Sequence, residues 1–446
     1  MSKLKLFAHQ EEALRETENL NRCAYYHDMG LGKTFTGAEK MMRLGAKVNL
    51  IICQKSKVDD WVNHLADYYE SHFGMIYDCT KWKGKDWQAL AANPDEPCAM
   101  VINYELAFRR SQLKTLSDFT LMLDESSMIQ NENAKRTKFI LSLNPKNVIL
   151  LSGTPTAGKY ENLWSQCSLL GWNISKDLYW RQYIDTEILD NEGYPIKVVR
   201  GYKNVERLKR KLRMHGAMFL KTEDVLCLPE QLDQTIRIPT TKEYRIFRKD
   251  RIVEVHTKVF DHECDSEWDG KTYDDLHELV GDTILTKMLY ERQLCGQYNK
   301  DKLDAFRDLV QSTEDRLIVF YNFTEEMNAM LRHTMDINRD ISIVNGQQKD
   351  LWAYNHCEDS VTFVQYQAGA MGLNLQKANK IIYFTPPLSS ELFEQSKKRT
   401  HRIGQERPCF YYYLTCRNSI EEDIYATLEM RRDYTDALFE EGEKNE

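Results

Sequence analysis

The sequence lacks any uninterrupted apolar run of the ~18–20 residues that a membrane-spanning helix requires. Its first segment, MSKLKLFAHQEEAL, carries acidic residues in a helical pattern and has no apolar signal core. Apolar residues make up 42% of the chain and charged residues 29%, which is typical of soluble globular proteins. We therefore expect no membrane association and a protein that stays where it is made. The expected compartment is the cytoplasm of a bacterium or of a virus-infected cell, or the nucleus in a eukaryote.

The sequence also lacks paired cysteines and an excess of positive charge. None of the 11 cysteines forms a CxxC pair, and Cys53 and Cys98 lie in apolar, strand-like runs. Reduced thiols explain this pattern better than a disulfide framework or a zinc site.

The 60 Lys and Arg residues against 68 Asp and Glu residues give a net charge of −8. This charge argues against a protein that coats nucleic acid by bulk charge, although a local basic groove is sufficient for binding.

Apolar runs alternate with helical stretches along the chain, without repeats or low-complexity tracts. This alternation is typical of α/β domains with mainly parallel strands. The expected strands of the first half are Arg22–Tyr26, Val48–Cys53, Ala99–Asn103, Phe119–Leu123 and Val148–Leu151. The pattern restarts with Leu317–Tyr321, Ile341–Val344, Val361–Gln365, Ile381–Phe384 and Phe410–Leu414. A chain of 446 residues is long enough for two such domains.

The predicted boundary between the two domains lies near Leu228-Pro229, so that the domains span 1–227 and 228–446. Between them the strand signal fades. We expect a helical protrusion at about 159–215 on the first domain and a helical insertion at about 241–300 on the second, the latter including KEYRIFRKDRIVEVHTKVF. After Asn418 the sequence predicts one amphipathic helix that ends in a solvated acidic run.

The segment DMGLGKT, Asp28 to Thr34, follows an apolar strand and precedes a helical stretch. This context is that of a phosphate-binding loop, in which glycines turn backbone N–H groups toward phosphate oxygens. Lys33 is expected to neutralise the β- and γ-phosphates, and the Thr34 hydroxyl to bind Mg²⁺. His27 stands where the strict loop pattern has its first glycine.

A second element of a hydrolytic site is FTLMLDES, Phe119 to Ser126. A buried strand that ends in two adjacent carboxylates suits a metal-dependent NTP hydrolase. Asp124 is expected to hold Mg²⁺ through its water shell, and Glu125 to orient the attacking water. Together with the upstream loop, this pair predicts Mg²⁺-dependent hydrolysis of a nucleoside triphosphate.

These segments and several others resemble, in order, the motifs of superfamily-two helicase-like ATPases, and within them of the Swi/Snf-like DNA translocases. The resembling segments are LFAHQEEAL, DMGLGKT, IICQKSKVDDW, VINYE, LSGTP, MFLKTEDVLCLPE, AGAMGLNLQKANKIIYF and EQSKKRTHRIGQ. The resemblance implies two tandem RecA-like lobes, each a parallel sheet with flanking helices, and a nucleic-acid-stimulated ATPase. The resemblance favours double-stranded DNA as the nucleic acid along which the protein moves. Any protein that directs it to a site would be a separate chain, and the resemblance does not indicate an oligomeric state.

The resemblance also implies roles for single residues. Gln10 would read the adenine, and the nucleotide site would further include Met29, Gly30, Leu31, Gly32, Gly372 and Gln395. Contacts with nucleic acid are implied for Lys55, Ser56, Asn103, Tyr104, Gly369 and Asn374. Ser152 and Thr154 would couple hydrolysis to lobe movement through their hydroxyls.

Arg399 and Arg402 match the two arginines that act as fingers in the family. Their spacing of three places them on one face of a helical turn, and a guanidinium near the γ-phosphate stabilises the charge of the transition state. One departure from the family lies beside the acidic pair. Ser126 and Ser127 replace a small residue and a His that helps to link the hydrolysis site to the coupling motif. A serine hydroxyl can still form a hydrogen bond there.

Three functions follow from these patterns. The leading one is an ATP-driven motor that moves along double-stranded DNA and remodels DNA structures or protein–DNA complexes, in repair or recombination among other pathways. The runner-up is a strand-separating DNA or RNA helicase. The third is a nucleic-acid-binding scaffold without ATPase activity, against which the intact Lys33, Asp124 and Arg399 argue.

Overall fold

The structure is a computed structural model that describes residues 5–89, 96–191, 194–260, 272–369 and 373–439. The chain divides into two compact units, which we call lobe 1 and lobe 2. Lobe 1 comprises Met1–Cys227 together with Met430–Glu446, and lobe 2 comprises Leu228–Glu429. The last residues of the chain thus belong to lobe 1, whereas the sequence assigned them to the second domain.

Lobe 1 is built on a seven-stranded sheet of order β3-β4-β2-β5-β6-β1-β9, in which all neighbouring strands are parallel. Its strands are β1 (Arg22–His27), β2 (Val48–Cys53), β3 (Met75–Asp78), β4 (Cys98–Asn103), β5 (Thr120–Asp124), β6 (Asn147–Leu151) and β9 (Ala217–Leu220). The five strands expected from apolar runs in this half are confirmed, each within one residue at either end.

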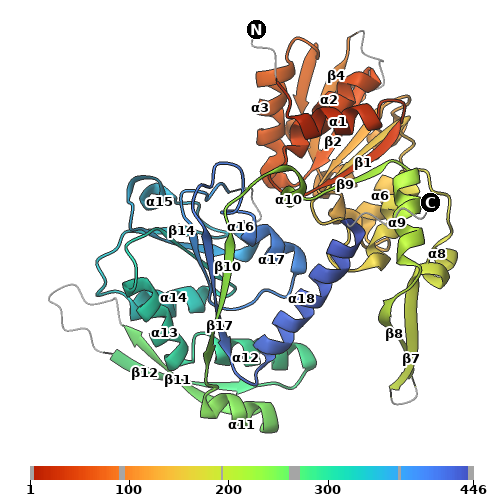
Figure 1. Ribbon diagram of the computed structural model, residues 1–446. Helices are drawn as coiled ribbons and strands as arrows, with labels where there is room; N and C mark the ends of the chain where they lie inside the picture. Colours follow the sequence, from red (N-terminus) through yellow and green to blue (C-terminus); the bar gives the residue numbers. More distant parts are fainter. Residues whose placement is uncertain (1–4, 90–95, 192–193, 261–271, 370–372, 440–446) are drawn as a thin grey trace. The chain divides into compact units, whose positions relative to one another are not determined.

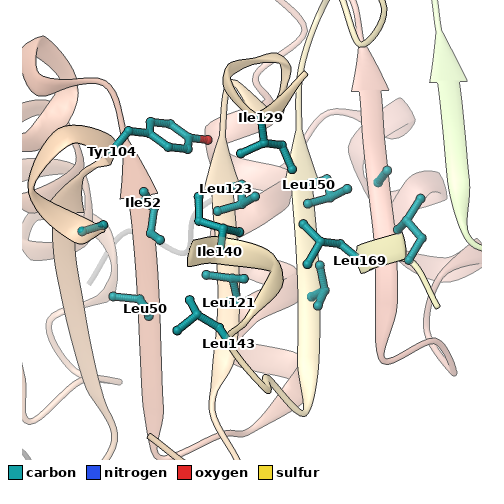
Figure 2. Close-up of a cluster of buried hydrophobic side chains, with 14 of the residues drawn as sticks. Leu50, Ile52, Tyr104, Leu121, Leu123, Ile129, Ile140, Leu143, Leu150 and Leu169 are labelled. Carbon is teal, nitrogen blue, oxygen red and sulfur yellow. The ribbon is translucent and has the colours of Figure 1, made fainter. Parts of the chain in front are cut away.

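Helices cover both faces of this sheet because side chains along a strand point alternately to opposite faces. Leu50 and Ile52 of β2 lie in one core cluster, whereas Ile51 between them lies in the other. Figure 2 shows Leu50 and Ile52 beside Leu121 and Leu123 in the first cluster. The face of Ile51 is covered by α1 (Ala8–Glu16), α2 (Lys33–Leu44) and α3 (Val58–Tyr69). The other is covered by α4 (Gly84–Ala89), α5 (Tyr104–Ala107), α6 (Lys135–Leu141), α7 (Trp164–Leu169), α8 (Lys176–Tyr183) and α9 (Val205–Met214).

The protrusion of lobe 1 is not purely helical, and the prediction for 159–215 was wrong in this respect. Between α8 and α9 an antiparallel hairpin of β7 (Ile184–Asn191) and β8 (Tyr194–Tyr202) extends from the lobe (Figure 1). The sequence IKVV within β8 is rich in β-branched residues, which favour extended backbone over helix.

Lobe 2 contains a six-stranded parallel sheet of order β10-β17-β16-β13-β15-β14. Its strands are β10 (Gln231–Ile238), β13 (Leu317–Tyr321), β14 (Ile341–Val344), β15 (Val361–Gln365), β16 (Lys380–Tyr383) and β17 (Cys409–Cys416). One face packs against α13 (Lys300–Gln311) and α14 (Thr324–His333). The other packs against α15 (Trp352–His356), α16 (Tyr366–Gly369), α17 (Ser390–Lys397) and α18 (Ile420–Phe439). The predicted α/β class with two parallel sheets is confirmed.

The insertion of lobe 2 also contains a hairpin where only helix was predicted. Helix α11 (Lys242–Asp250) ends at Arg251, whose φ of 62° lies in the left-handed region and stops the helix. The chain then forms an antiparallel pair of β11 (Ile252–Phe260) and β12 (Thr272–Val280), followed by α12 (Ile284–Cys295). The period-two alternation of IVEV explains the strand, because Val253 and Val255 both face the small core shared with α11 and α12.

The tail predicted after Asn418 is the single helix α18, and its acidic end at 440–446 lies outside the described residues. From Met430 onward this helix belongs to lobe 1, where the Tyr160 hydroxyl donates to the Tyr434 carbonyl over 2.8 Å. Among the helices of the described segments, none combines the length and apolar character needed to cross a bilayer.

Candidate active site

The segment DMGLGKT forms the connection between β1 and α2, as a phosphate loop requires. Helix α2 begins at Lys33, and Gly32 before it has φ 72°, which L-residues rarely adopt. A Cβ at Gly32 would lie 2.3 Å from Nε2 of Gln10. The loop therefore needs glycine at this position both for its backbone and for the close approach of Gln10.

Gln10 of α1 is buried and bound directly to this loop. Its Nε2 donates to the carbonyls of Leu31 and Gly32 over 3.3 and 3.2 Å, and its Oε1 accepts from the Phe7 N–H over 2.9 Å. The nucleotide-reading role implied for Gln10 stays a prediction. The contacts fix its side chain at the phosphate loop.

The ammonium of Lys33 lies within the loop. Its Nζ donates to the carbonyls of His27 and Asp28 over 2.8 and 3.1 Å. The Asp28 carboxylate in turn accepts from the backbone N–H and the hydroxyl of Thr222, both over 3.1 Å, at the first residue of α10 (Thr222–Val225). The loop is thus tied to the end of lobe 1.

Asp124 is the last residue of β5, and its carboxylate is held by a buried tryptophan. The indole Nε1 of Trp61 in α3 donates to Oδ2 of Asp124 over 2.8 Å. Burial raises the pKa of Asp124, while the Trp61 bond and the charge of Lys33 act in the opposite direction. A bound cation at this carboxylate would oppose the effect of burial further.

Tyr104 holds the backbone of the acidic pair. The side chain is fully buried at the edge of the cluster drawn in Figure 2, and its hydroxyl donates to the carbonyls of Asp124 and Glu125 over 2.9 and 3.2 Å. Glu125 has φ 53°, a conformation that costs about 1–3 kcal/mol and persists only where the surroundings enforce it. The side chain of Tyr104 is thus enclosed within lobe 1, although the family resemblance implied a nucleic-acid contact for it.

The segment LSGTP follows β6 and lies beside both halves of the site. The Ser152 hydroxyl donates to Oε2 of Glu125 over 3.4 Å and accepts from the Thr154 N–H over 3.1 Å. A Cβ at Gly153 would lie 3.4 Å from Nζ of Lys33. The structure therefore brings together Lys33, Glu125 and Ser152, of which Glu125 and Ser152 lie 27 residues apart in the sequence and Lys33 lies far upstream of both.

The other predicted residues occupy different surroundings. Lys55 and Ser56 are exposed after β2, whereas Asn103 is buried and donates from Nδ2 to Glu105 over 3.0 Å. In lobe 2, Asn374 is exposed, Gly369 is buried, and Gly372 lies outside the described residues. Their contacts with nucleic acid or nucleotide stay predictions.

The arginine segment follows α17 in lobe 2. Gln395 is buried and its Nε2 donates to Oε1 of Glu391 over 3.3 Å. The backbone carbonyl of Arg399 accepts from the Leu375 N–H over 3.1 Å, which joins this segment to the AGAMGLNLQ segment. Burial lowers the pKa of the Arg402 guanidinium. Within the segments that the structure describes, the Arg402 side chain forms no hydrogen bond or ion pair.

The residues expected to hold Mg²⁺ offer the right chemistry for it. The Thr34 hydroxyl and the Asp124 carboxylate are hard oxygen donors of the kind that Mg²⁺ prefers. Trp61 engages Oδ2 of Asp124, which fixes the orientation of the carboxylate. Thr34 stands at the start of α2, next to Lys33. The donor set thus fits a magnesium–nucleotide complex.

Comparison with known families gives one consistent result. The family model of the SNF2-related domain matches residues 9–300, and that of the helicase conserved C-terminal domain matches residues 301–404.

Among known proteins, the chain is similar to the putative ATP-dependent helicase/translocase YwqA of Bacillus subtilis, at 23% identity over 93% of this chain and 46% of that protein. It is similar to the DNA repair and recombination protein RAD54 of Saccharomyces cerevisiae, at 23% identity over 94% of this chain and 54% of that protein. The chain thus spans about half the length of these relatives. The SWI2/SNF2 ATPase core of Sulfolobus solfataricus, solved with double-stranded DNA, is 18% identical with a TM-score of 0.45, covering 97% of this chain and 93% of that chain.

The match to the SNF2-related domain extends over well over half of the 446 residues, and the helicase C-terminal match continues it directly. The order of the phosphate loop, the acidic pair and the arginine segment along the two lobes is in accord with these matches. The chain therefore belongs to the SNF2-related family.

Proposed function

We propose that the protein is an ATP-driven motor that moves along double-stranded DNA. The observation that carries this proposal is the juxtaposition in lobe 1 of the Lys33 loop, the Asp124–Glu125 pair and Ser152 of the following motif. A phosphate loop, a metal-binding carboxylate and a water-orienting carboxylate are the parts that NTP hydrolysis requires.

In this mechanism the chain positions a nucleotide and a water. The N-terminus of α2 and the Lys33 ammonium bind the phosphates, and Asp124 with Thr34 would hold Mg²⁺. Bound Mg²⁺ supplies positive charge against the phosphate oxygens. Glu125, whose turn is held by Tyr104, orients and polarises the attacking water. Arg399 and Arg402 of lobe 2 are the proposed fingers for transition-state charge.

Support for DNA as the track comes from the relatives, whose names describe a helicase/translocase and a DNA repair and recombination protein. The exposed Lys55 and Ser56 offer a backbone-binding position that reads phosphate rather than sequence. A separate targeting protein and a cytoplasmic location stay predictions.

The test is steady-state ATP hydrolysis by the purified chain alone and with duplex DNA, single-stranded DNA or RNA. Strong stimulation by duplex DNA that is absent in Lys33→Ala supports the proposal, and displacement of a triplex-forming strand then tests translocation. Stimulation by single strands or RNA alone favours a strand-separating helicase. Absence of hydrolysis with every nucleic acid contradicts both motor functions and leaves the scaffold.

A further inference from the structure

A buried glutamine connects the acidic pair to the LSGTP segment by a route that the sequence did not reveal. Gln166 lies in α7 within the apolar stretch WSQCSLL and is completely buried. Its Oε1 accepts from the hydroxyl of Ser126 over 2.8 Å and from that of Tyr26 over 2.9 Å. Its Nε2 donates to the Pro155 carbonyl over 2.8 Å. One amide thus joins the residue after the acidic pair to the end of LSGTP.

The chemistry of the partners fixes how this amide is oriented. The Pro155 carbonyl can only accept, so the NH₂ group must face it, and the amide oxygen must face the two hydroxyls. Tyr26, Ser126 and Gln166 are all 0% exposed, so no solvent replaces a lost partner. A buried polar group without a partner is costly, which makes this set of bonds mutually dependent.

Two sets of hydrogen bonds therefore connect the turn at 124–126 with the segment at 152–155. Ser152 contacts the Glu125 carboxylate directly, over 3.4 Å. Ser126 contacts Pro155 through Gln166, over two bonds of 2.8 Å. Ser126 directly follows the acidic pair, so the Gln166 route begins at the turn that carries both carboxylates.

We propose that Gln166 is a positioning residue of the hydrolysis site, which transmits displacement of the 152–155 segment to the turn that carries Asp124 and Glu125. Among the described residues, Gln166 forms no hydrogen bond with Lys33 or with the carboxylates of Asp124 and Glu125. It acts through its bonds with Ser126 and Pro155. This inference rests on the proposed function, because it concerns how binding of DNA changes the rate of ATP hydrolysis.

The experiment compares Ser126→Ala, Gln166→Met and Tyr26→Phe in the full chain, measuring kcat and KM for ATP with and without duplex DNA. Tyr26→Phe is the matched control, because it removes a hydroxyl from the same Oε1 without breaking the route from Ser126 to Pro155. Methionine keeps the unbranched shape of glutamine without its hydrogen bonds. Thermal unfolding of each variant reports how much of any change is loss of stability.

We expect Ser126→Ala and Gln166→Met to lower the ratio of DNA-stimulated to unstimulated kcat about fivefold or more, with KM for ATP within about twofold. Tyr26→Phe should keep that ratio within about twofold of the wild-type value, even where its unfolding midpoint falls as much as those of the other two variants. The double variant Ser126→Ala/Gln166→Met should be no worse than Gln166→Met, because both changes break one route.

Other results overturn the inference. An unchanged ratio in Ser126→Ala and Gln166→Met, with a stimulated wild-type chain, contradicts the role of Gln166 and leaves the proposed function intact. A ratio that falls in all three variants in proportion to their unfolding midpoints shows a structural role only. A wild-type chain that duplex DNA does not stimulate contradicts the proposed function, and the inference falls with it.

Discussion

The indole N–H of Trp61 donates to Oδ2 of Asp124 over 2.8 Å and so joins α3 to the end of β5. Trp61 is 2% exposed, so water does not compete for this bond. The bond favours the ionised carboxylate, whereas burial raises the pKa of Asp124. Trp61 thus helps to keep the proposed metal ligand charged and fixed in orientation.

Replacing Trp61 by Phe should weaken binding of Mg²⁺ or Mn²⁺ together with ADP by about tenfold, the effect expected when a partner of a metal ligand is removed. The loss of a hydrogen bond to a charged group should also lower the free energy of unfolding by about 1.5–3 kcal/mol. Electron paramagnetic resonance of free Mn²⁺ measures the affinity, and chemical denaturation measures the stability.

Trp87→Phe is the matched control for this experiment. Trp87 is also buried, at 4% exposed, but its indole N–H has no hydrogen-bond partner among the described residues. The control should therefore leave Mn²⁺ affinity at the wild-type value. Equal loss of affinity in both variants would contradict a specific role for the Trp61 bond.

A second prediction separates backbone strain from steric contact at the phosphate loop. Gly32 and Gly45 have similar φ values of 72° and 65°, but a Cβ at Gly32 would meet Gln10 at 2.3 Å, whereas a Cβ at Gly45 would meet nothing within 4 Å. Gly45→Ala should cost about 1 kcal/mol of stability and leave nucleotide affinity unchanged. Gly32→Ala should in addition abolish binding of a fluorescent ADP analogue, because Gln10 or the loop must move. Retained affinity in Gly32→Ala would refute this account of Gln10.

A third prediction concerns the buried His27, which stands in place of the first loop glycine. Burial, followed by the charge of Lys33, lowers the pKa of His27 from 6.5 to about 3. Between pH 6.5 and 3 the unfolded chain therefore binds a proton that the folded chain does not, so the free energy of unfolding must fall as pH falls through this window. The slope is about 1.4 kcal/mol per pH unit for one proton.

His27→Phe keeps a ring of similar shape and removes this titration. The difference in unfolding free energy between variant and wild type should shift in favour of the variant between pH 7.5 and pH 5, measured by urea denaturation at each pH. A difference that does not change with pH would show that the His27 ring gains a proton in the folded protein.

A fourth prediction concerns the ion pair of Lys302 and Glu421 in lobe 2, whose Nζ–Oε1 distance is 2.6 Å and whose side chains are 0% and 1% exposed. Burial lowers the pKa of Lys302, but the Glu421 carboxylate together with the thiols of Cys416 and Cys295 raises it, so that the net pKa lies above its usual value. Lys302→Met leaves Glu421 buried without this partner and should cost about 3–5 kcal/mol.

Lys300→Ala, at a surface pair with Asp304 where Lys300 is 80% exposed, should cost less than about 1 kcal/mol. The double variant Lys302→Met/Glu421→Leu should recover most of the loss, since no buried charge is then left unpaired. Urea denaturation of the three variants measures these values. A double variant that is less stable than Lys302→Met would contradict the assignment of the loss to an unpaired carboxylate.

Several features of this protein were readable from the sequence because they depend on residues close together in the chain. The buried strands appear as apolar runs bounded by polar residues, and β2, β13, β14 and β15 have the predicted bounds. The phosphate loop and the acidic pair are likewise contiguous, since glycines, a lysine and carboxylates must occupy fixed positions along one turn of backbone.

The hairpins of the two protrusions show where prediction from the local sequence pattern was wrong. KEYRIFRKD and the strand IVEVHTKVF are separated only by Arg251, and both are rich in charged and apolar residues. The left-handed Arg251 and the pairing of Ile252 with Val280 decide where helix gives way to strand. Cross-strand partners lie far along the chain, so their contribution is absent from any local pattern.

By itself, the sequence determined the α/β class, the strands of the two sheets other than β3, β9 and β10, and the residues of the phosphate loop and acidic pair. The tertiary structure alone decided which buried donors hold those residues, with Trp61 on Asp124, Tyr104 on the backbone of Glu125, and Gln166 between Ser126 and Pro155. The physical reason is that a buried hydrogen bond depends on distance and direction between groups that folding brings together, and residue spacing along the chain contains neither.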